Sequence, residues 1–477
     1  MPLIAIVAGV VLGIIAGAMP GLSPSMGVAL LVPFTYTLSP SLALILLVSI
    51  YMAANYGGSI TAVTINAPGT ASAVVTAFDG YPLTRQGRPG IGLGVSLVAS
   101  TIGGLIGTVI LIFFSVPLAA FAVKCHPAEY FALAIFGLAT VASLGGDNWA
   151  KAFTATVFGL LLNTIGVDPI SGVSRFTFGI PQLYDGFSLI PALIGLFAIS
   201  EVLKQIEGGT LDSNVFTGDQ SHWPSIHDYW ALKYNILRSS LLGTMIGIFP
   251  GAGATIAAFI SYDAARRVSR NPETFGKGAP EGVAAAEAAN SGSVGGALVP
   301  LLTLGIPGSA TTAVLIGALM IHDLVPGPRL FTNNPEIVYG IFSSLLIANV
   351  VLLLLGQLGS RLWIKVTVVP KRILYPLILC VSVIGSYAVR YSFFDVISCL
   401  GFGVLGWFMR RHDYPVAPII LGLVLGNIVE TNFRRAVLME GYGVFFTRPV
   451  SAIVLSVAIL SFAVPLIQQT RKKNKRH

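Results

Sequence analysis

The stretch "GIFPGAGATIAAF" (residues 247–259) decides the fold, because it places a proline beside a glycine within a long apolar run. Pro250 lacks an N–H group and clashes with the preceding helical turn, and Gly251 tolerates the backbone conformations that end a helix. In lipid, every unpaired backbone group carries a large free-energy cost. A helix broken at membrane depth is therefore tolerated only where protein or a water-filled cavity surrounds the break.

The rest of the chain is hydrophobic enough to cross a membrane many times. Hydrophobic residues make up 54% of the sequence and charged residues 10%, against about 25% charged residues in soluble domains. Apolar runs near the span length of about 20 residues recur at 2–19, 91–123 and 341–359. The spacing of the polar breaks predicts an all-α polytopic membrane protein with about ten to twelve transmembrane helices. Runs such as 345–357 do not alternate apolar and polar residues, which excludes a β-barrel.

Charge and cysteine content place the protein in a lipid bilayer rather than on nucleic acid. The N-terminal apolar segment has no basic region before it, so we expect a retained membrane helix rather than a signal peptide. The net charge is +8, and basic residues gather in short loops and in the tail 471–477, which we expect in the cytoplasm. The three cysteines have no paired spacing, so neither a disulfide framework nor a zinc site is indicated.

An internal repeat divides the chain. "LGIIAGAMPG" (12–21) aligns with "LGTMIGIFPG" (242–251), and "YGGSITAVTINAPGTAS" (56–72) resembles "VGGALVPLLTLGIPGSAT" (294–311). A weaker third pair follows in the same order, which indicates two homologous halves. We predict a first transmembrane repeat at 1–210, a polar linker at 211–235, a second transmembrane repeat at 236–470 and the basic tail at 471–477.

The charges of corresponding loops favour an inverted arrangement of the two repeats. After the first Pro-Gly unit, the loop 37–41 carries no charge, whereas its counterpart 262–282 carries four basic residues. After the second unit the bias reverses, because 81–90 carries two arginines and 322–336 carries one arginine against two acids. Basic loops mark the cytoplasmic side, so equivalent loops are predicted to lie on opposite sides of the membrane.

Each Pro-Gly unit is expected to end one half-helix and begin another. The new half-helix presents free N–H groups and the positive end of its dipole, and both attract anions. Paired interrupted helices predict the substrate site of a transporter, here formed by Ser59, Asn66, Pro68, Gly69, Thr70, Ser72, Asn290, Ser293, Pro307, Gly308, Ser309 and Thr311. The facing half-helices would be shaped by Pro20, Gly21, Pro250 and Gly251.

The alternative is that small residues only allow helices to pack closely. We favour packing for the two GxxxG patterns, Gly13 with Gly17 and Gly243 with Gly247. For the Pro-Gly units, with the hydroxyl and amide side chains that flank them, we favour a role in the site.

Three acidic residues within apolar segments call for separate interpretations. Glu287 leads into the second half of the site, and an acid there is costly. It either takes part in cation or proton coupling with Asn66 and Asn290, or it makes a structural hydrogen bond or lies solvated in a loop. Asp79 is expected to be a turn or cap residue, and Glu430 is expected to pair with Arg434 one helical turn later.

Enzyme motifs are absent or lack their structural context. The sequence has no Walker A motif and no HExxH motif, and its six histidines show no ligand spacing. The pattern Gly401-x-Gly403-x-x-Gly406 lies in an apolar run without a βαβ unit, so we interpret it as packing. We therefore expect a protein that is not an enzyme and has no cofactor or bound metal apart from a coupling Na⁺.

The long motif at 247–328, together with "AGAMPGLSP" (16–24) and the segment 56–90, resembles the large membrane subunit of bacterial tripartite tricarboxylate transporters, the TctA family. The resemblance implies a secondary active transporter subunit of the bacterial inner membrane that imports di- or tricarboxylates, driven by a Na⁺ or H⁺ gradient. It also implies a small TctB-like membrane subunit and a periplasmic TctC-like solute-binding protein as partners.

Two departures from the family pattern leave the identity of the carboxylate open. The family often has glutamate where Thr70 stands, and two adjacent asparagines where this chain has Asn290-Ser291. The choice between Na⁺ and H⁺ is also open at this stage. A passive anion channel is the alternative function, and it would need a continuous pore and no coupling ion.

Overall fold

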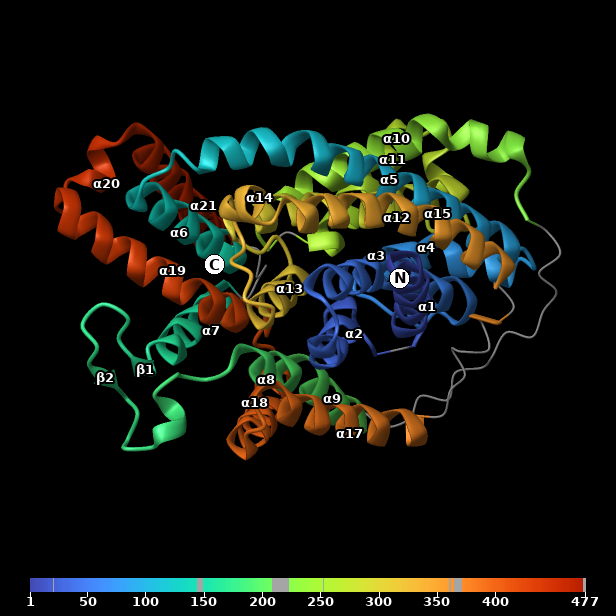
Figure 1. The fold of residues 1–477 in the computed structure, drawn as a ribbon. Helices are drawn as coiled ribbons and strands as arrows, with labels where there is room; N and C mark the ends of the chain where they lie inside the picture. The colour runs from blue at the N-terminus through green and yellow to red at the C-terminus, as the bar shows by residue number, and fades with distance from the viewer. Residues whose placement is uncertain are drawn as a thin grey trace.

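The computed structural model describes residues 1–19, 21–143, 149–207, 223–251, 253–359, 362–363 and 371–474. Within these residues the only strands are β1 (Gly166–Val167) and β2 (Ser174–Arg175), which pair antiparallel in a short hairpin. The remaining secondary structure is helical (Figure 1). The prediction of an all-α protein is confirmed.

The first half of the chain begins with two short helices and a long, deeply buried one. Its helices are α1 (Pro2–Ala18), α2 (Pro24–Leu31), α3 (Pro40–Ile65), α4 (Ala73–Arg85), α5 (Pro89–Ala122), α6 (Pro127–Ser143), α7 (Trp149–Asn163), α8 (Leu189–Ile194) and α9 (Ser200–Glu207). A 3-10 segment, η1 (Val32–Thr37), follows α2, and a π-turn, η4 (Gly195–Ile199), joins α8 to α9.

The second half of the chain, as far as it is described, has helices as its regular secondary structure. It contains α10 (Ile226–Ile248), α11 (Gly253–Val268), α12 (Pro280–Leu304), α13 (Ala310–Ile321), α14 (Arg329–Asn333), α15 (Pro335–Leu358), α17 (Lys371–Arg390), α18 (Phe393–Arg411), α19 (Ala417–Glu440), α20 (Val444–Thr447) and α21 (Pro449–Asn474). Of the predicted linker, residues 211–222 lie outside the described residues, as do residues 475–477 of the tail.

Six described helices are long and apolar enough to cross a membrane by length and composition. They are Pro40–Ile65, Pro89–Ala122, Leu189–Glu207, Pro335–Leu358, Arg372–Arg390 and Phe393–Arg411. Four shorter apolar helices accompany them, and two of these, α1 and α13, are short because a Pro-Gly unit interrupts the chain beside them. The protein is therefore a multi-pass membrane protein, and the count of ten to twelve spans stays a prediction.

The described Pro-Gly units do interrupt the helices, as predicted. The helix α3 ends at Ile65, Asn66 adopts a left-handed conformation with φ of 55°, and α4 begins only at Ala73. The helix α12 ends at Leu304, Gly305 has φ of 72°, and α13 begins at Ala310. Gly21 and Gly251 also have positive φ between their helices, and Pro20 lies outside the described residues.

Glycine contacts bring the helices that carry these breaks together. A Cβ atom on Gly13 of α1 would lie 2.6 Å from the carbonyl oxygen of Ile50 on α3. A Cβ atom on Gly243 of α10 would lie 2.3 Å from the carbonyl oxygen of Ala289 on α12. Both GxxxG patterns therefore serve close helix packing, as interpreted from the sequence. The same kind of contact packs α12 against α5, and α12 is buried along nearly its whole length.

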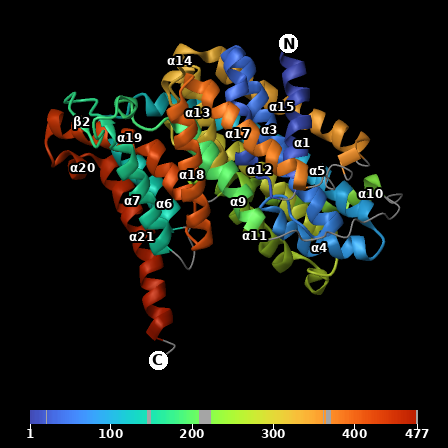
Figure 2. The same ribbon diagram turned by 90° about the horizontal axis from the view of Figure 1, so that it is seen from below.

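The two halves contact each other crosswise: each half places the end of one early helical segment against the end of a different segment of the other half. The loop after α4 meets the loop after α11, where Gln86 Nε2 donates to the carbonyl oxygen of Lys277 at 2.7 Å. The end of η1 meets the end of α13, where Thr35 Oγ1 lies 3.4 Å from His322 Nε2. Figure 2 shows α13, α14 and β2 toward one end of the molecule and α4, α11 and the C-terminus toward the other. An inverted repeat predicts this crossing, and the inversion itself stays a prediction.

A separate group of helices forms one side of the molecule. The helices α6, α7, α19, α20 and α21 pack on one another, and Figure 1 shows them away from α1, α3, α4 and α10. Phe131 of α6, Phe433 of α19 and Phe445 of α20 pack together within this group. The rings of Phe433 and Phe445 are stacked, and the Phe131 ring is tilted against both. A large cleft among the described residues lies between this group and the helices that carry the second-half break.

Candidate functional site

The first Pro-Gly loop, residues 66–72, is held mainly by its own half. Asn66 is exposed, and Pro68 is half-buried. The Gly69 N–H donates to the carbonyl oxygen of Gly58 on α3 at 3.2 Å. Thr70 Oγ1 accepts from the Ala73 N–H at 3.2 Å and bonds to Ser72 Oγ at 3.1 Å. These hydroxyls therefore lie at the first turn of α4, as the sequence predicts.

The second Pro-Gly loop, residues 305–309, is buried and is tied to both halves. The Gly251 N–H donates to the carbonyl oxygen of Gly308 at 3.1 Å, so the two breaks of the second half meet. Ser309 caps α13, since its Oγ accepts from the Thr312 N–H at 3.2 Å while Thr312 Oγ1 accepts from the Ser309 N–H at 2.7 Å. Tyr51 OH, on α3, lies 3.1 Å from Ser309 Oγ and joins this loop to the first half.

Both loops leave helix-start donors free. The cap of α13 uses the N–H groups of Ser309 and Thr312, and Ala310 and Thr311 keep N–H groups without an acceptor among the described residues. At the start of α4, the N–H of Val74 likewise has no acceptor within the described residues. Helix-start N–H groups beside hydroxyl side chains form a favourable environment for a carboxylate.

Gly69 and Gly308 have packing roles of their own. A Cβ atom on Gly69 would lie 2.0 Å from the carbonyl oxygen of Gly17, and one on Gly308 would lie 2.7 Å from Ala297 Cα. No side chain fits at either position without a shift of the backbone. A bulky replacement of Gly308 would therefore disrupt packing whether or not the loop binds an anion, and it cannot serve as a test of the site.

Glu287 lies fully buried on α12, among helices from both halves. Thr76 Oγ1 of α4 donates to Oε1 of the carboxyl group, and Ser100 Oγ of α5 donates to Oε2 at 2.8 Å. The described residues provide no lysine, arginine or histidine that pairs with it. One helical turn later, Asn290 Nδ2 donates to the carbonyl oxygen of Asn55 on α3 at 3.1 Å, while Asn290 Oδ1 has no partner among the described residues.

Other predicted site residues lie near Glu287 rather than in the loops. Ser293 Oγ donates to the carbonyl oxygen of Asn290 at 2.7 Å, and Ser59 Oγ lies 2.5 Å from Ser96 Oγ on α5. These residues share the buried seam of α3, α5 and α12. Asn66 is exposed, and its side chain has no hydrogen bond to Glu287 or to Asn290 among the described residues. Among the described residues, no group of three His, Cys, Asp or Glu could hold a metal ion.

Asp79 is a cap, as expected, but for a segment of the other half. Its buried Oδ1 accepts from the N–H groups of Gly276 at 2.8 Å, Gly278 at 2.9 Å and Ala279 at 2.8 Å. Its Oδ2 accepts from Tyr262 OH at 2.8 Å. The carboxylate thus anchors α4 to the loop that precedes α12, across about 200 residues of sequence.

The large cleft, of about 1300 Å³, adjoins the second loop and is lined by none of the predicted substrate residues. It is lined by Leu304 and Gly305, by the helices α13 and α19, and by the loop around the β-hairpin. Its charged lining residues are Arg175, Arg329, Arg390 and Arg435 with Asp185, Asp323 and Glu430. Of these residues, only Glu430 was singled out from the sequence, as a partner of Arg434. The others come from segments far apart in the chain, and no local motif marks them.

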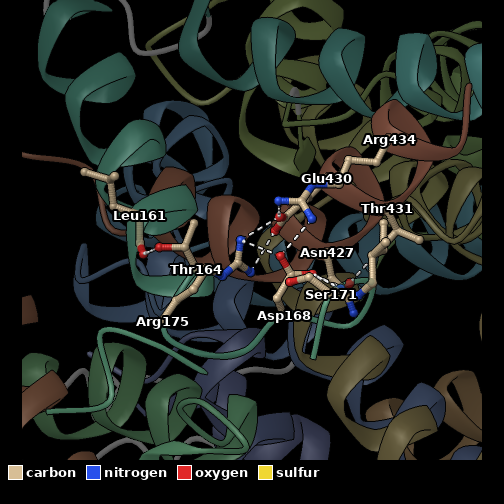
Figure 3. A network of polar contacts seen from close by, with 10 residues as sticks. Leu161, Thr164, Asp168, Ser171, Arg175, Asn427, Glu430, Thr431 and Arg434 are labelled. Atoms are coloured by element: carbon tan, nitrogen blue, oxygen red, sulfur yellow. Dashed lines mark hydrogen bonds and ion pairs between the residues drawn. The ribbon is translucent and has the colours of Figure 1, made fainter. Parts of the chain in front are cut away.

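An ion-pair network at the edge of this cleft fixes the hairpin to α19 (Figure 3). Arg175 donates to both oxygens of Glu430, at 2.6 and 3.1 Å, and Arg434 donates to Asp168 at 2.7 Å. Arg434 also lies 3.1 Å from Glu430, so the predicted pair is confirmed. The backbone N–H groups of Ile170 and Ser171, with Arg434, hold the pKa of Asp168 well below its usual range. This network leaves Arg329 and Arg435 as the cleft arginines without an ion-pair partner among the described residues.

Comparison with known proteins gives a consistent result. Residues 3–421 match the model of the tripartite tricarboxylate transporter TctA family. An uncharacterized 52.8 kDa protein in the TAR-I ttuC' 3' region of Agrobacterium vitis is 37% identical over 451 residues, covering 94% of this chain and 90% of that protein. An uncharacterized protein in the TAR-II ttuC' 3' region of the same organism is 36% identical over 233 residues, covering 48% of this chain and 96% of that protein. No solved structure matches the chain.

Proposed function

Because the chain belongs to the tripartite tricarboxylate transporter TctA family, we propose that it is the large membrane subunit of an importer of small organic anions, driven by a Na⁺ or H⁺ gradient. The observation that carries the proposal is the pair of helix breaks at 66–72 and 305–309, each followed by a helix that begins with hydroxyl side chains. Interrupted helices in two repeats are typical of the substrate sites of secondary transporters.

The carboxylates of the substrate bind at the starts of α4 and α13. Free N–H groups and the positive ends of the helix dipoles stabilise the negative charge, and Thr70, Ser72, Ser309 and Thr311 donate hydroxyl hydrogen bonds. Asn66 and Asn290 help to place the anion or the coupling cation. No buried lysine or arginine is needed, since backbone dipoles supply the positive potential.

The cleft beside the second loop is the route by which the anion reaches the site. It reaches Gly305, the first residue of the second loop. Its charged lining has four arginines and three acids, and this small positive excess favours the entry of anions.

The family membership also supports partners and a location. We propose a small membrane subunit and a periplasmic solute-binding protein as partners, and the bacterial inner membrane as the location. The tail 471–477 is rich in basic residues, which supports a cytoplasmic C-terminus.

Uptake of radiolabelled citrate, tartrate and malate into proteoliposomes with the partner proteins tests this proposal. We expect saturable uptake that stops when the Na⁺ and pH gradients are collapsed. Uptake that does not saturate and persists without a gradient would establish the channel alternative. A binding-protein ligand screen would then define the carboxylate.

The site itself is tested with Ser309→Ala and Thr311→Ala. Loss of a hydroxyl bond to a charged group costs about 1.5–3 kcal/mol, so KM should rise on the order of tenfold or more for each variant. Ser343→Ala is the matched control, because Ser343 on α15 is exposed and its hydroxyl bonds only to its own helix. An unchanged KM in both loop variants would remove the second loop from the site.

A further inference from the structure

Glu287 is a buried acid in surroundings that offer it no positive charge. The helices α3 and α5 pack beside it, and neither contains a charged residue anywhere along its length. Both carboxyl oxygens accept a hydroxyl hydrogen bond, from Thr76 and Ser100. Two hydroxyl groups do not neutralise a carboxylate, so a negative charge at Glu287 is compensated only when a proton or a cation joins it.

The titratable groups on the neighbouring helices are engaged elsewhere. On α3, Tyr56 is buried and interacts with Glu287, but a phenol supplies no positive charge. On α4, Asp79 is saturated by backbone N–H groups, and Tyr262 of α11 bonds to Asp79. On α10, Arg238 donates to Asn235. No cation among the described residues therefore bonds to the Glu287 carboxyl group.

Asn290 supplies the second observation. It lies one helical turn along α12 from Glu287, and its amide group interacts with the Glu287 carboxyl group. Its Oδ1 is fully buried and has no donor among the described residues. A proton on Glu287 would remove the buried charge and add a donor to this polar cluster. A bound Na⁺ would instead need several oxygen ligands, and among the described residues only the Thr76 and Ser100 hydroxyls bond directly to the carboxylate oxygens.

Glu287 is also close enough to the start of α4 to affect an anion there. Thr76 is four residues after Ser72, which is about 6 Å along a helix axis. A carboxylate at Glu287 would repel an anion at this helix start from roughly 10 Å. With an effective dielectric constant of about 20, this repulsion weakens anion binding on the order of tenfold. Protonation removes the repulsion, and the coupling is reciprocal.

We propose that Glu287 carries the coupling proton, taking it up as the anion binds at the start of α4 and releasing it once the anion has left. This inference rests on the proposed function and selects H⁺ as the coupling ion. Uptake of the proton forms an O–H bond on the carboxyl group, with water on the outer side as the source. The same bond breaks when the site opens to the other side, so one proton crosses with each anion.

The protonation itself is tested without any substrate. Infrared difference spectra of the purified protein between low and high pH should show the C=O band of a protonated carboxylic acid. The band should be lost in Glu287→Gln and retained in Glu281→Gln, the matched control on the same helix, whose carboxylate accepts a hydrogen bond from Ser269 at 2.5 Å. A band that persists in Glu287→Gln would overturn the proposal.

The coupling is tested with citrate in proteoliposomes that contain the partner proteins. Glu287→Gln should keep citrate counterflow, which needs no net proton movement, and should lose accumulation driven by a pH gradient. Its citrate affinity should no longer fall about tenfold as the pH rises. Accumulation equal to that of the wild-type protein would contradict the proposal. Failure of wild-type citrate uptake would count against the proposed function for citrate, and the infrared result would still decide the protonation of Glu287.

A second variant covers the case in which Glu287→Gln does not insert. Asn290→Ala keeps the carboxyl group and removes the amide that interacts with it. The infrared band should therefore shift to the position of a carboxylic acid with a weaker hydrogen bond. An unshifted band would show that the absorbing acid does not interact with Asn290, and it would overturn the assignment of the band to Glu287.

Discussion

The two Pro-Gly loops share a sequence pattern and differ in what holds them. In the first loop Asn66 is exposed and Pro68 is half-buried, and the hydrogen bonds of this loop among the described residues stay within the first half. The second loop is buried and bonds to Gly251 of its own half and to Tyr51 of the other. The chain therefore places one motif in two environments, one open and locally supported, the other enclosed and supported across the halves.

This difference shows that the solvent exposure of a loop does not predict whether its backbone has room for an added side chain. The more exposed first loop has the tighter backbone contact, because Gly69 meets the carbonyl oxygen of Gly17. It is also backed by Asp79 on α4, whereas the equivalent position on α13 is Ala318. We infer that α4 is held in place by the charged side chain of Asp79 in its middle. The helix α13 is instead held by the capping box at its first turn.

The largest effect is expected from alanine at the two loop glycines. In Gly69→Ala the new Cβ would lie 2.0 Å from a carbonyl oxygen, and in Gly308→Ala 2.7 Å from a Cα atom. Overpacking of this kind costs roughly 3 kcal/mol, and we expect the larger loss at Gly69. Thermal unfolding in detergent measures it, with Gly401→Ala as control, since a Cβ there has nothing within 4 Å. A higher midpoint for Gly69→Ala than for Gly308→Ala would reverse the comparison.

Removal of the anchor behind the first loop should have the next largest effect. Asp79→Ala leaves the N–H groups of Gly276, Gly278 and Ala279 without their acceptor, at a cost of about 3 kcal/mol. Hydrogen exchange at 276–279 should accelerate, and the unfolding midpoint should fall. Asp263→Ala is the control, because its pair with Arg267 is exposed and contributes at most about 0.5 kcal/mol. Equal midpoints for the two variants would show that α4 does not depend on the anchor.

Removal of the helix-cap hydroxyls should cost less stability, and the loss should differ between the two loops. Ser309→Ala removes the capping box and the bond to Tyr51, and we expect a loss of about 1–2 kcal/mol. Thr70→Ala removes one hydroxyl acceptor, for about 0.5–1 kcal/mol. In a double-mutant cycle, Tyr51→Phe and Ser309→Ala should show a coupling of about 0.5 kcal/mol or more. A coupling free energy of zero would mean that the contact with Tyr51 of the first half does not stabilise the second loop.

The smallest expected effect is the pH dependence of stability. It should arise away from both loops, because neither loop contains a charged residue. The pKa of Asp168 is lowered in the folded protein by the Ile170 and Ser171 N–H groups and by Arg434. A lowered pKa contributes stability that is fully present above the unfolded value of about 3.9 and is lost as the pH falls from there through the lowered folded value. Asp168→Asn should therefore unfold earlier than wild type at pH 7, and the difference should narrow steadily as the pH falls below about 3.9. A difference between the two proteins that does not depend on pH would contradict this assignment.

Local chemistry explains why the helix breaks could be predicted. Proline and glycine act on their own turn of the chain, so the ends of α3 and α12 follow from residues within a few positions of the break. The pairing of Glu430 with Arg434 is likewise a contact one helical turn apart. The partners of Asp79 and Glu287 are each about 200 residues away, and no periodicity in the sequence marks them.

The sequence by itself determined that this protein is a bundle of membrane helices interrupted at paired positions, because hydrophobicity and backbone stereochemistry are properties of short segments. Only the tertiary structure decided which residues meet at those interruptions. The second loop reaches Tyr51, the cleft collects its arginines from separate segments, and Glu287 is enclosed without a counter-charge. Such contacts depend on how whole helices pack against one another, and that packing is a property of the complete fold.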